Sequence, residues 1–226
     1  MNTGNDSGLE ALTAIDRLIA IMTMLRDKQH GCPWDLEQTI KSLLPYTLEE
    51  VYEVADAIEN NDLVELEDEL GDLLFQVIFY AQIAKEQGAF DFQDIATAIT
   101  DKLIRRHPHV FPGGDVEQFG ISQEIDAQQV VVNWEAIKEI EREEKRKKGG
   151  KQAVQGVESI LDDVPRALPA MERARKLQKR AAQVGFDWAE VAPVLEKLKE
   201  EVVEFEEALA SGDLERMSDE LGDVLF

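Results

Sequence analysis

The feature that most constrains this chain is an internal repeat. Residues 49–75 have the sequence EEVYEVADAIENNDLVELEDELGDLLF, and residues 200–226 have the sequence EEVVEFEEALASGDLERMSDELGDVLF. At a constant offset of 151 residues, 14 of the 27 paired positions are identical and no gap is needed. A repeat of this kind marks a structural unit that the chain contains twice. The sequence therefore predicts two related modules.

Apolar residues recur at steps of three and four through most of the chain, as they do along one face of a helix. Glycine and proline fall between these segments, and we find no convincing run of the alternating pattern that is typical of strands. We therefore predict an all-α fold, with residues 69–84 as the buried helix of a bundle or an interface because they are apolar on nearly every side. The expected helices span 9–26, 47–60, 63–87, 91–106, 126–146, 166–183 and 193–210.

A change in composition separates the two copies. Residues 145–156 are basic, then rich in glycine, and lack apolar periodicity, which indicates a linker. We predict an N-terminal module over residues 1–145, a linker over 146–160 and a C-terminal module over 161–226. The second copy stops inside the segment that the first continues, so we expect the C-terminal module to be incomplete.

The charge balance excludes several classes of partner. The chain carries 47 acidic against 24 basic residues, a net charge of −23. Phosphates of nucleic acids and anionic membrane surfaces repel such a chain, so we expect neither as a partner. The sequence has no apolar stretch of 18 residues that would predict a spanning helix. A single cysteine, Cys32, and the lack of a signal-peptide pattern indicate the cytoplasm.

Each copy carries acids in the pattern E-E-x-x-E, a fifteen-residue spacer, and E-x-x-D. Residues three apart share one face of a helix. Asn61 and Gly212 suit the left-handed turn between two antiparallel helices. The acids of each copy are placed symmetrically about that turn, so a helical hairpin brings four carboxylates together. They are Glu50, Glu53, Glu69 and Asp72 in the first copy, and Glu201, Glu204, Glu220 and Asp223 in the second.

Four converging carboxylates among apolar neighbours cannot all stay ionised without a cation. Ligation by carboxylate oxygen alone indicates Mg²⁺ or Mn²⁺, and Mg²⁺ in such sites usually also holds substrate phosphates. Gly71 and Gly222, between the acids, indicate close approach by another helix or a ligand. A solvated acidic face is the alternative, and Glu50 could instead complete a capping box with Thr47. The recurrence of the pattern in the second copy favours a metal site.

At these residues the sequence resembles the MazG family of nucleoside triphosphate pyrophosphohydrolases. Their E-E-x-x-E and E-x-x-D signature occurs here twice. Further segments are similar to the two-domain bacterial form: GCPWD (31–35), PYTLEE (45–50), GDLLFQVIFYAQIA (71–84), KLIRRHPHVF (102–111) and VGFDW (184–188).

The resemblance implies a dimeric helical bundle of the all-α NTP pyrophosphatase type, with two tandem MazG-like modules. It implies a Mg²⁺-dependent hydrolase that converts an NTP or dNTP to the monophosphate and pyrophosphate. It also implies that the eight carboxylates bind the metal, and that Lys197 and Arg216 bind phosphate. The competing hypothesis is a non-catalytic dimeric scaffold, or a regulatory module that binds Mg-nucleotide without turnover.

Several roles stay open. We take Glu50, Glu53, Glu201 and Glu204 as the catalytic candidates, and the acceptor of the water proton could be Glu49 or Glu53 in one copy and Glu200 or Glu204 in the other. Arg105 and Arg106, next to His107 and His109, could bind phosphate or simply end a helix with positive charge. Trp34 and Trp188 could be nucleobase platforms, although a place in the core is favoured.

Overall fold

The computed structural model describes residues 9, 11–121, 125–147, 159–162 and 164–225, and every regular element within them is helical. The all-α prediction is therefore confirmed. The chain divides into two compact units, Met1–Glu144 and Lys145–Phe226, which we call the N-terminal unit and the C-terminal unit. Most of the predicted linker, from 148 to 158, lies outside the described residues. Among the described helices, none has both the length and the apolar character to cross a membrane.

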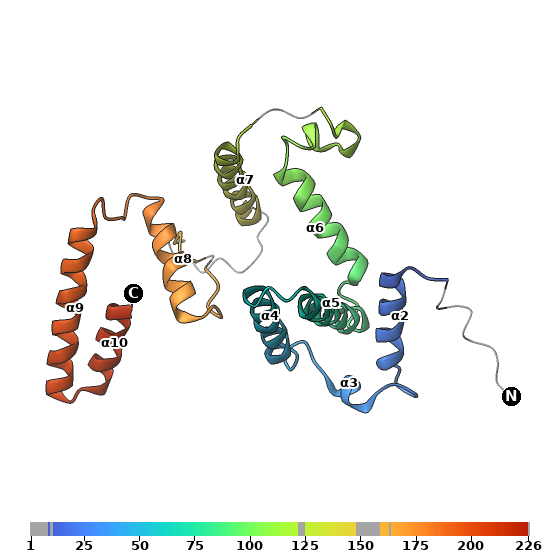
Figure 1. Ribbon diagram of the computed structural model, residues 1–226, viewed down its shortest axis with the longest axis horizontal. Coiled ribbons are helices and arrows are strands. Elements are labelled where there is room, and N and C mark those ends of the chain that lie inside the picture. Colours follow the sequence, from blue (N-terminus) through green and yellow to red (C-terminus); the bar gives the residue numbers. More distant parts are fainter. Residues whose placement is uncertain (1–8, 10, 122–124, 148–158, 163, 226) are drawn as a thin grey trace. The chain divides into compact units, whose positions relative to one another are not determined.

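In the N-terminal unit, the long helix α5 contacts α2, α4 and α6 (Figure 1). In the C-terminal unit, α9 and α10 form a second antiparallel pair (Figure 1). The α-helices are α2 (Ala14–Leu25), α3 (Pro33–Glu37), α4 (Leu44–Glu59), α5 (Leu63–Glu86), α6 (Phe92–Arg106), α7 (Ala127–Lys147), α8 (Ala170–Ala182), α9 (Val191–Ser211) and α10 (Leu214–Leu225). Two short 3₁₀ turns, η1 (Pro112–Gly114) and η2 (Val116–Gln118), follow α6.

The first helices begin at positions that differ from the prediction. The Thr13 hydroxyl accepts a hydrogen bond from the Asp16 N–H, so α2 begins after this cap rather than at residue 9. Helix α4 begins three residues earlier than expected and includes Pro45 in its first turn. Thr47 therefore lies inside α4, where its hydroxyl donates to the carbonyl of Leu43. The alternative role of Glu50, as a capping-box partner of Thr47, is wrong.

The turn between α4 and α5 has the predicted left-handed residue. Asn61 has φ 55°, its N–H donates to the Ile58 carbonyl, and the N–H of Asp62 donates to the Ala57 carbonyl. This is a Schellman ending, and Gly212, with φ 71°, ends α9 in the same left-handed conformation. The Asp62 carboxylate also accepts two N–H groups from the first turn of α5. The N–H of Asp62 donates to the Ala57 carbonyl and not to the Glu65 side chain, so the second hydrogen bond of a capping box between Asp62 and Glu65 is not formed.

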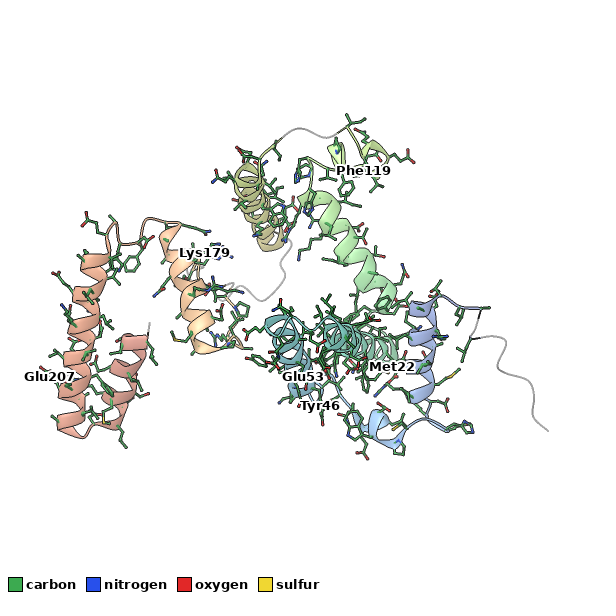
Figure 2. The ribbon with its side chains drawn as sticks, viewed as in Figure 1. Met22, Tyr46, Glu53, Phe119, Lys179 and Glu207 are labelled. Atoms are coloured by element: carbon green, nitrogen blue, oxygen red, sulfur yellow. The ribbon has the colours of Figure 1, made fainter. Side chains whose placement is uncertain are left out.

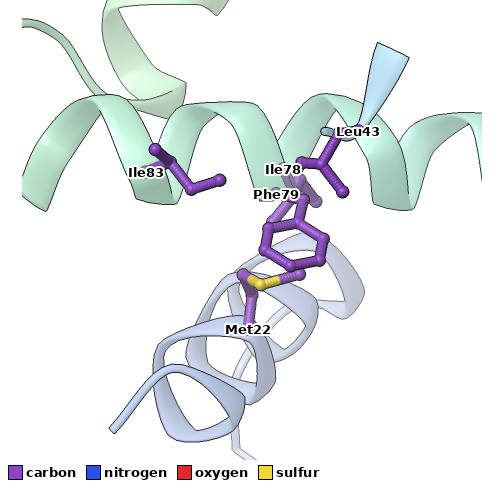
Figure 3. Close-up of a cluster of buried hydrophobic side chains, with 5 residues drawn as sticks. All are labelled: Met22, Leu43, Ile78, Phe79 and Ile83. Atoms are coloured by element: carbon purple, nitrogen blue, oxygen red, sulfur yellow. The ribbon is translucent and has the colours of Figure 1, made fainter. Parts of the chain in front are cut away.

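The core of the N-terminal unit joins α2 to the second half of α5. Figure 3 shows the Met22 side chain of α2 against the ring of Phe79. The buried cluster comprises Met22, Leu43, Ile78, Phe79 and Ile83, each at most 3% exposed. Leu70 and Leu74, earlier on α5, are 49% and 38% exposed. Burial within the bundle is therefore confirmed for the part of α5 that faces this core, while burial of the earlier part in an interface stays a prediction.

Candidate metal centre

The α4–α5 hairpin brings together Glu50, Glu69 and Asp72. One carboxylate oxygen from each lies within 4.8 Å of the others, and we call these three residues the N-terminal acidic cluster. Glu53, labelled on α4 in Figure 2, lies outside this set. The symmetric hairpin thus juxtaposes three of its four predicted acids closely enough for one cation to contact them after small side-chain adjustments.

Burial and repulsion act together on this cluster. The pKa of Glu50 is raised above its usual range, chiefly because the side chain is partly withdrawn from water and then because the charges of Asp72 and Glu53 lie near it. Desolvation likewise raises the pKa of Glu69, with repulsion from Glu53 and Glu65 adding to it. A bound divalent cation would offset both the desolvation and the repulsion, because its positive charge stabilises the ionised carboxylates.

Gln76 is a neighbour of the cluster that is not among the predicted site residues. It lies one turn beyond Asp72 on α5 and is only 6% exposed. Its amide nitrogen donates to Glu50 at 3.4 Å, while its buried carbonyl oxygen has no hydrogen-bond partner. A buried acceptor beside an all-oxygen donor set suits a hydrated cation, whose water can donate to it. The four-residue spacing from Asp72 is the sequence signal that could have revealed Gln76.

The α9–α10 hairpin repeats the arrangement with a different set. Oxygens of Glu201, Glu204 and Glu220 lie within 4.8 Å of one another, and we call these residues the C-terminal acidic cluster. Asp223, the fourth predicted acid, lies outside the set. Glu201 is only 8% exposed. Desolvation raises the pKa of Glu204, and repulsion from Glu220 and Glu201 raises it further.

Lys197 and Arg216, the two residues expected to bind phosphate, lie beside the C-terminal acidic cluster. The ammonium of Lys197 is 2.7 Å from a Glu201 oxygen, and this hydrogen bond is the main reason that the pKa of Lys197 is raised. Arg216 is 3.4 Å from both Glu220 and Glu207, the latter labelled in Figure 2. The cluster therefore already contains its own counter-charges.

Arg105 and Arg106 have a partner that neither hypothesis named. Both guanidinium groups pair with Glu141 on α7, at 2.6 Å and 2.5 Å. The hydrogen bonds from Arg106 and then Arg105 lower the pKa of Glu141 to about 2. These arginines join α6 to α7 within the N-terminal unit.

Two tryptophans differ from expectation, and two glycines have no described helix against them. Trp34 and Trp188 are 47% and 54% exposed, so the favoured place in the core is wrong for both. The rings of Trp34 and Tyr46 make a T-shaped contact, with 5.6 Å between ring centroids. A Cβ added at Gly71 or Gly222 would meet no described atom within 4 Å, so no described helix makes the close approach expected there, and approach by a ligand stays a prediction.

Known proteins resemble this chain along most of its length. The family model described as "MazG nucleotide pyrophosphohydrolase domain" matches residues 38–111, and the one described as "Phosphoribosyl-ATP pyrophosphohydrolase" matches residues 168–226. An Escherichia coli protein named "Nucleoside triphosphate pyrophosphohydrolase" is 50% identical over 217 residues, which cover 95% of this chain and 76% of that protein.

A Thermotoga maritima protein named "Nucleoside triphosphate pyrophosphohydrolase/pyrophosphatase MazG" is 40% identical over 217 residues, covering 96% of this chain and 74% of that protein. The solved structure of a mazG-related protein from Thermotoga maritima is 28% identical. It matches with a TM-score of 0.44 and covers 55% of this chain and 98% of its own.

Proposed function

Because this chain belongs to the MazG family of nucleoside triphosphate pyrophosphohydrolases, we propose that it hydrolyses the bond between the α and β phosphorus atoms of an NTP or dNTP. The products are the nucleoside monophosphate and pyrophosphate. The observation that carries this proposal is the convergence of carboxylates from two antiparallel helices, with oxygens within 4.8 Å, in both copies of the repeat. A triphosphate needs such a site, since its own negative charge must be neutralised before water can attack.

We propose Mg²⁺ as the cation, with Mn²⁺ able to replace it, because the donors are all carboxylate oxygens. The proposed ligands are Glu50, Glu53, Glu69 and Asp72 in one unit, and Glu201, Glu204, Glu220 and Asp223 in the other. A bound Mg²⁺ polarises phosphoryl oxygens and makes a coordinated water more acidic. The buried amide of Gln76 supports this assignment, since it keeps the Glu50 carboxylate facing the other two acids.

One carboxylate of each hairpin would also accept the proton of the attacking water. Glu53 is exposed and lies outside the three closely spaced acids, so it can act as this acceptor even if it also contacts the ion, with Glu49 as the alternative. Glu204 or Glu200 has this role in the C-terminal unit. Lys197 and Arg216, which are about half exposed, can turn from the acids toward phosphate oxygens.

A homodimer completes the proposal. Large apolar side chains on the hairpin that bears the N-terminal acidic cluster are exposed in the single chain, and burying them against a second copy would remove them from water. They include Leu48, Val51 and Tyr52 on α4, and Leu63, Val64, Leu70 and Leu74 on α5. The net charge of −23 supports the absence of nucleic-acid or membrane partners, and the single cysteine supports the cytoplasm as location.

The proposed modules are residues 1–145 and 161–226, joined by 146–160. The division of the chain into compact units after Glu144 supports the first of these boundaries. Each module then contains one acidic hairpin and thus one candidate metal centre.

The test is to incubate the chain with each NTP and dNTP and Mg²⁺, and to separate the products by anion-exchange chromatography. We expect monophosphate and pyrophosphate, with turnover abolished when Glu50→Gln and Glu201→Gln are combined. Glu59→Gln, at the exposed end of α4, is the matched control and should keep full activity. Diphosphate and orthophosphate as products would contradict the proposal. Nucleotide binding without any turnover would favour the regulatory module instead.

A further inference from the structure

The two acidic hairpins have acids at equivalent positions of the repeat. They differ in the charge of the residues one helical turn before those acids. On α9, Lys197 precedes Glu201 by four residues and its ammonium lies 2.7 Å from that carboxylate. At the corresponding position of the repeat, Tyr46 precedes Glu50 by four residues on α4. The ring of Tyr46 packs edge-on against Trp34 and offers no positive charge to Glu50. A positively charged side chain in one copy therefore corresponds to a neutral aromatic side chain in the other.

The second helix of each hairpin shows a full reversal of charge. On α10, Arg216 precedes Glu220 by four residues and its guanidinium lies 3.4 Å from that carboxylate. The corresponding residue on α5 is Glu65, which precedes Glu69 by four residues and repels it. Among the side chains that the structure describes, no lysine or arginine forms an ion pair with any of the three acids of the N-terminal acidic cluster.

These differences between the copies change how readily a divalent ion can bind at each cluster. In the C-terminal acidic cluster, an incoming divalent ion has to displace Lys197 and Arg216 from the carboxylates, or bind beside two positive charges. In the N-terminal acidic cluster, no described lysine or arginine has to be displaced, and the Glu50 carboxylate accepts a hydrogen bond from the neutral amide of Gln76. A phosphate-bearing ligand would make it easier for a divalent ion to bind at the C-terminal acidic cluster, because phosphate oxygens attract Lys197 and Arg216 away from the acids.

We infer that the N-terminal acidic cluster binds a divalent cation on its own, whereas the C-terminal acidic cluster takes its cation together with a phosphate-bearing ligand. This inference rests on the proposed function, because it concerns the same ion. Each of two partly exposed ion pairs contributes a few-fold to affinity, so we expect the N-terminal cluster to bind free Mn²⁺ about tenfold more tightly. Tyr46, Glu65, Lys197 and Arg216 thus determine which ligand each cluster prefers.

The test is a titration of the full chain with Mn²⁺ alone, in which the electron paramagnetic resonance signal reports free Mn²⁺. We expect two classes of site that differ about tenfold in dissociation constant. Glu50→Gln should remove the tighter class, and Glu201→Gln the weaker one. Calorimetric titration of the Glu50→Gln variant with the Mn²⁺ complex of α,β-methylene-ATP should then show tighter binding than Mn²⁺ alone.

Exchanging the residues between the copies supplies the matched variants. Tyr46→Lys with Glu65→Arg should weaken the tighter class about tenfold, and Lys197→Tyr with Arg216→Glu should strengthen the weaker class by a similar factor. All four side chains are exposed or partly exposed, and a far-UV circular dichroism spectrum verifies that the helices persist. The wild-type titration decides the question even where an exchanged chain fails to fold.

Equal affinities at the two clusters, loss of the tighter class in Glu201→Gln, or affinities unchanged by the exchanges would each overturn the inference while leaving the proposed function intact. No Mn²⁺ binding at either cluster, with or without nucleotide, would instead contradict the metal-dependent function itself. The two failures are therefore distinguishable in one set of measurements.

Discussion

Glu141 on α7 is held by two arginines at the end of α6, and it is only 13% exposed. Its pKa is lowered to about 2, so the ionised carboxylate stabilises the fold above its ordinary pKa. That contribution is lost as the pH falls through about 4.5 toward 2. We predict that Glu141→Gln lowers the free energy of unfolding by about 1.5–3 kcal/mol at pH 7. Urea denaturation at pH 7 and at pH 2.5 measures the difference, which should shrink at the lower pH.

A pH-independent effect of Glu141→Gln would contradict this account of the ion pairs.

Single residues also show where prediction from sequence ends. The acids were identifiable because their spacing repeats, and both hairpins do bring three of four together. The orphaned oxygen of Gln76 and the exposure of Trp34 depend on how neighbouring elements pack, and a local pattern does not contain that information.

Helix ends determine whether the two hairpins align their acids. Gly212 has φ 71°, and a Cβ added there would meet no described atom within 4 Å, so its requirement is one of backbone conformation alone. We predict that Gly212→Ala lowers the free energy of unfolding of the C-terminal unit by about 1 kcal/mol, because L-residues pay this cost in the left-handed region. Urea denaturation followed by far-UV circular dichroism measures it.

Asn61→Gly is the matched change in the other hairpin. Since Asn61 already has φ 55°, glycine should leave stability unchanged or slightly higher. Unchanged stability in Gly212→Ala would contradict the role given to this turn. The register of both hairpins was predictable from these turn residues and the symmetric acids. The starts of α2 and α4 were not, because Thr13 and Pro45 compete with neighbouring positions that the apolar pattern treats alike.

At the scale of the whole molecule, the proposed homodimer accounts for the apolar side chains left exposed on α4 and α5. We predict a mass about twice 25.5 kDa by light scattering after size exclusion. Leu74→Glu, which introduces a charge on that surface, should shift the mass toward a single chain. Thr97→Glu, at an exposed polar position of α6, is the control and should leave the mass unchanged. A monomeric wild-type chain would contradict the proposal.

Both hairpins are proposed to bind a divalent cation between carboxylates of two helices, and anomalous diffraction observes this directly. Crystals grown with Mn²⁺ and α,β-methylene-ATP should give one anomalous peak between Glu50, Glu69 and Asp72. A second peak should lie among Glu201, Glu204 and Glu220. Maps without a peak at either cluster, with the carboxylates turned apart into solvent, would contradict the metal centres and the hydrolysis that depends on them.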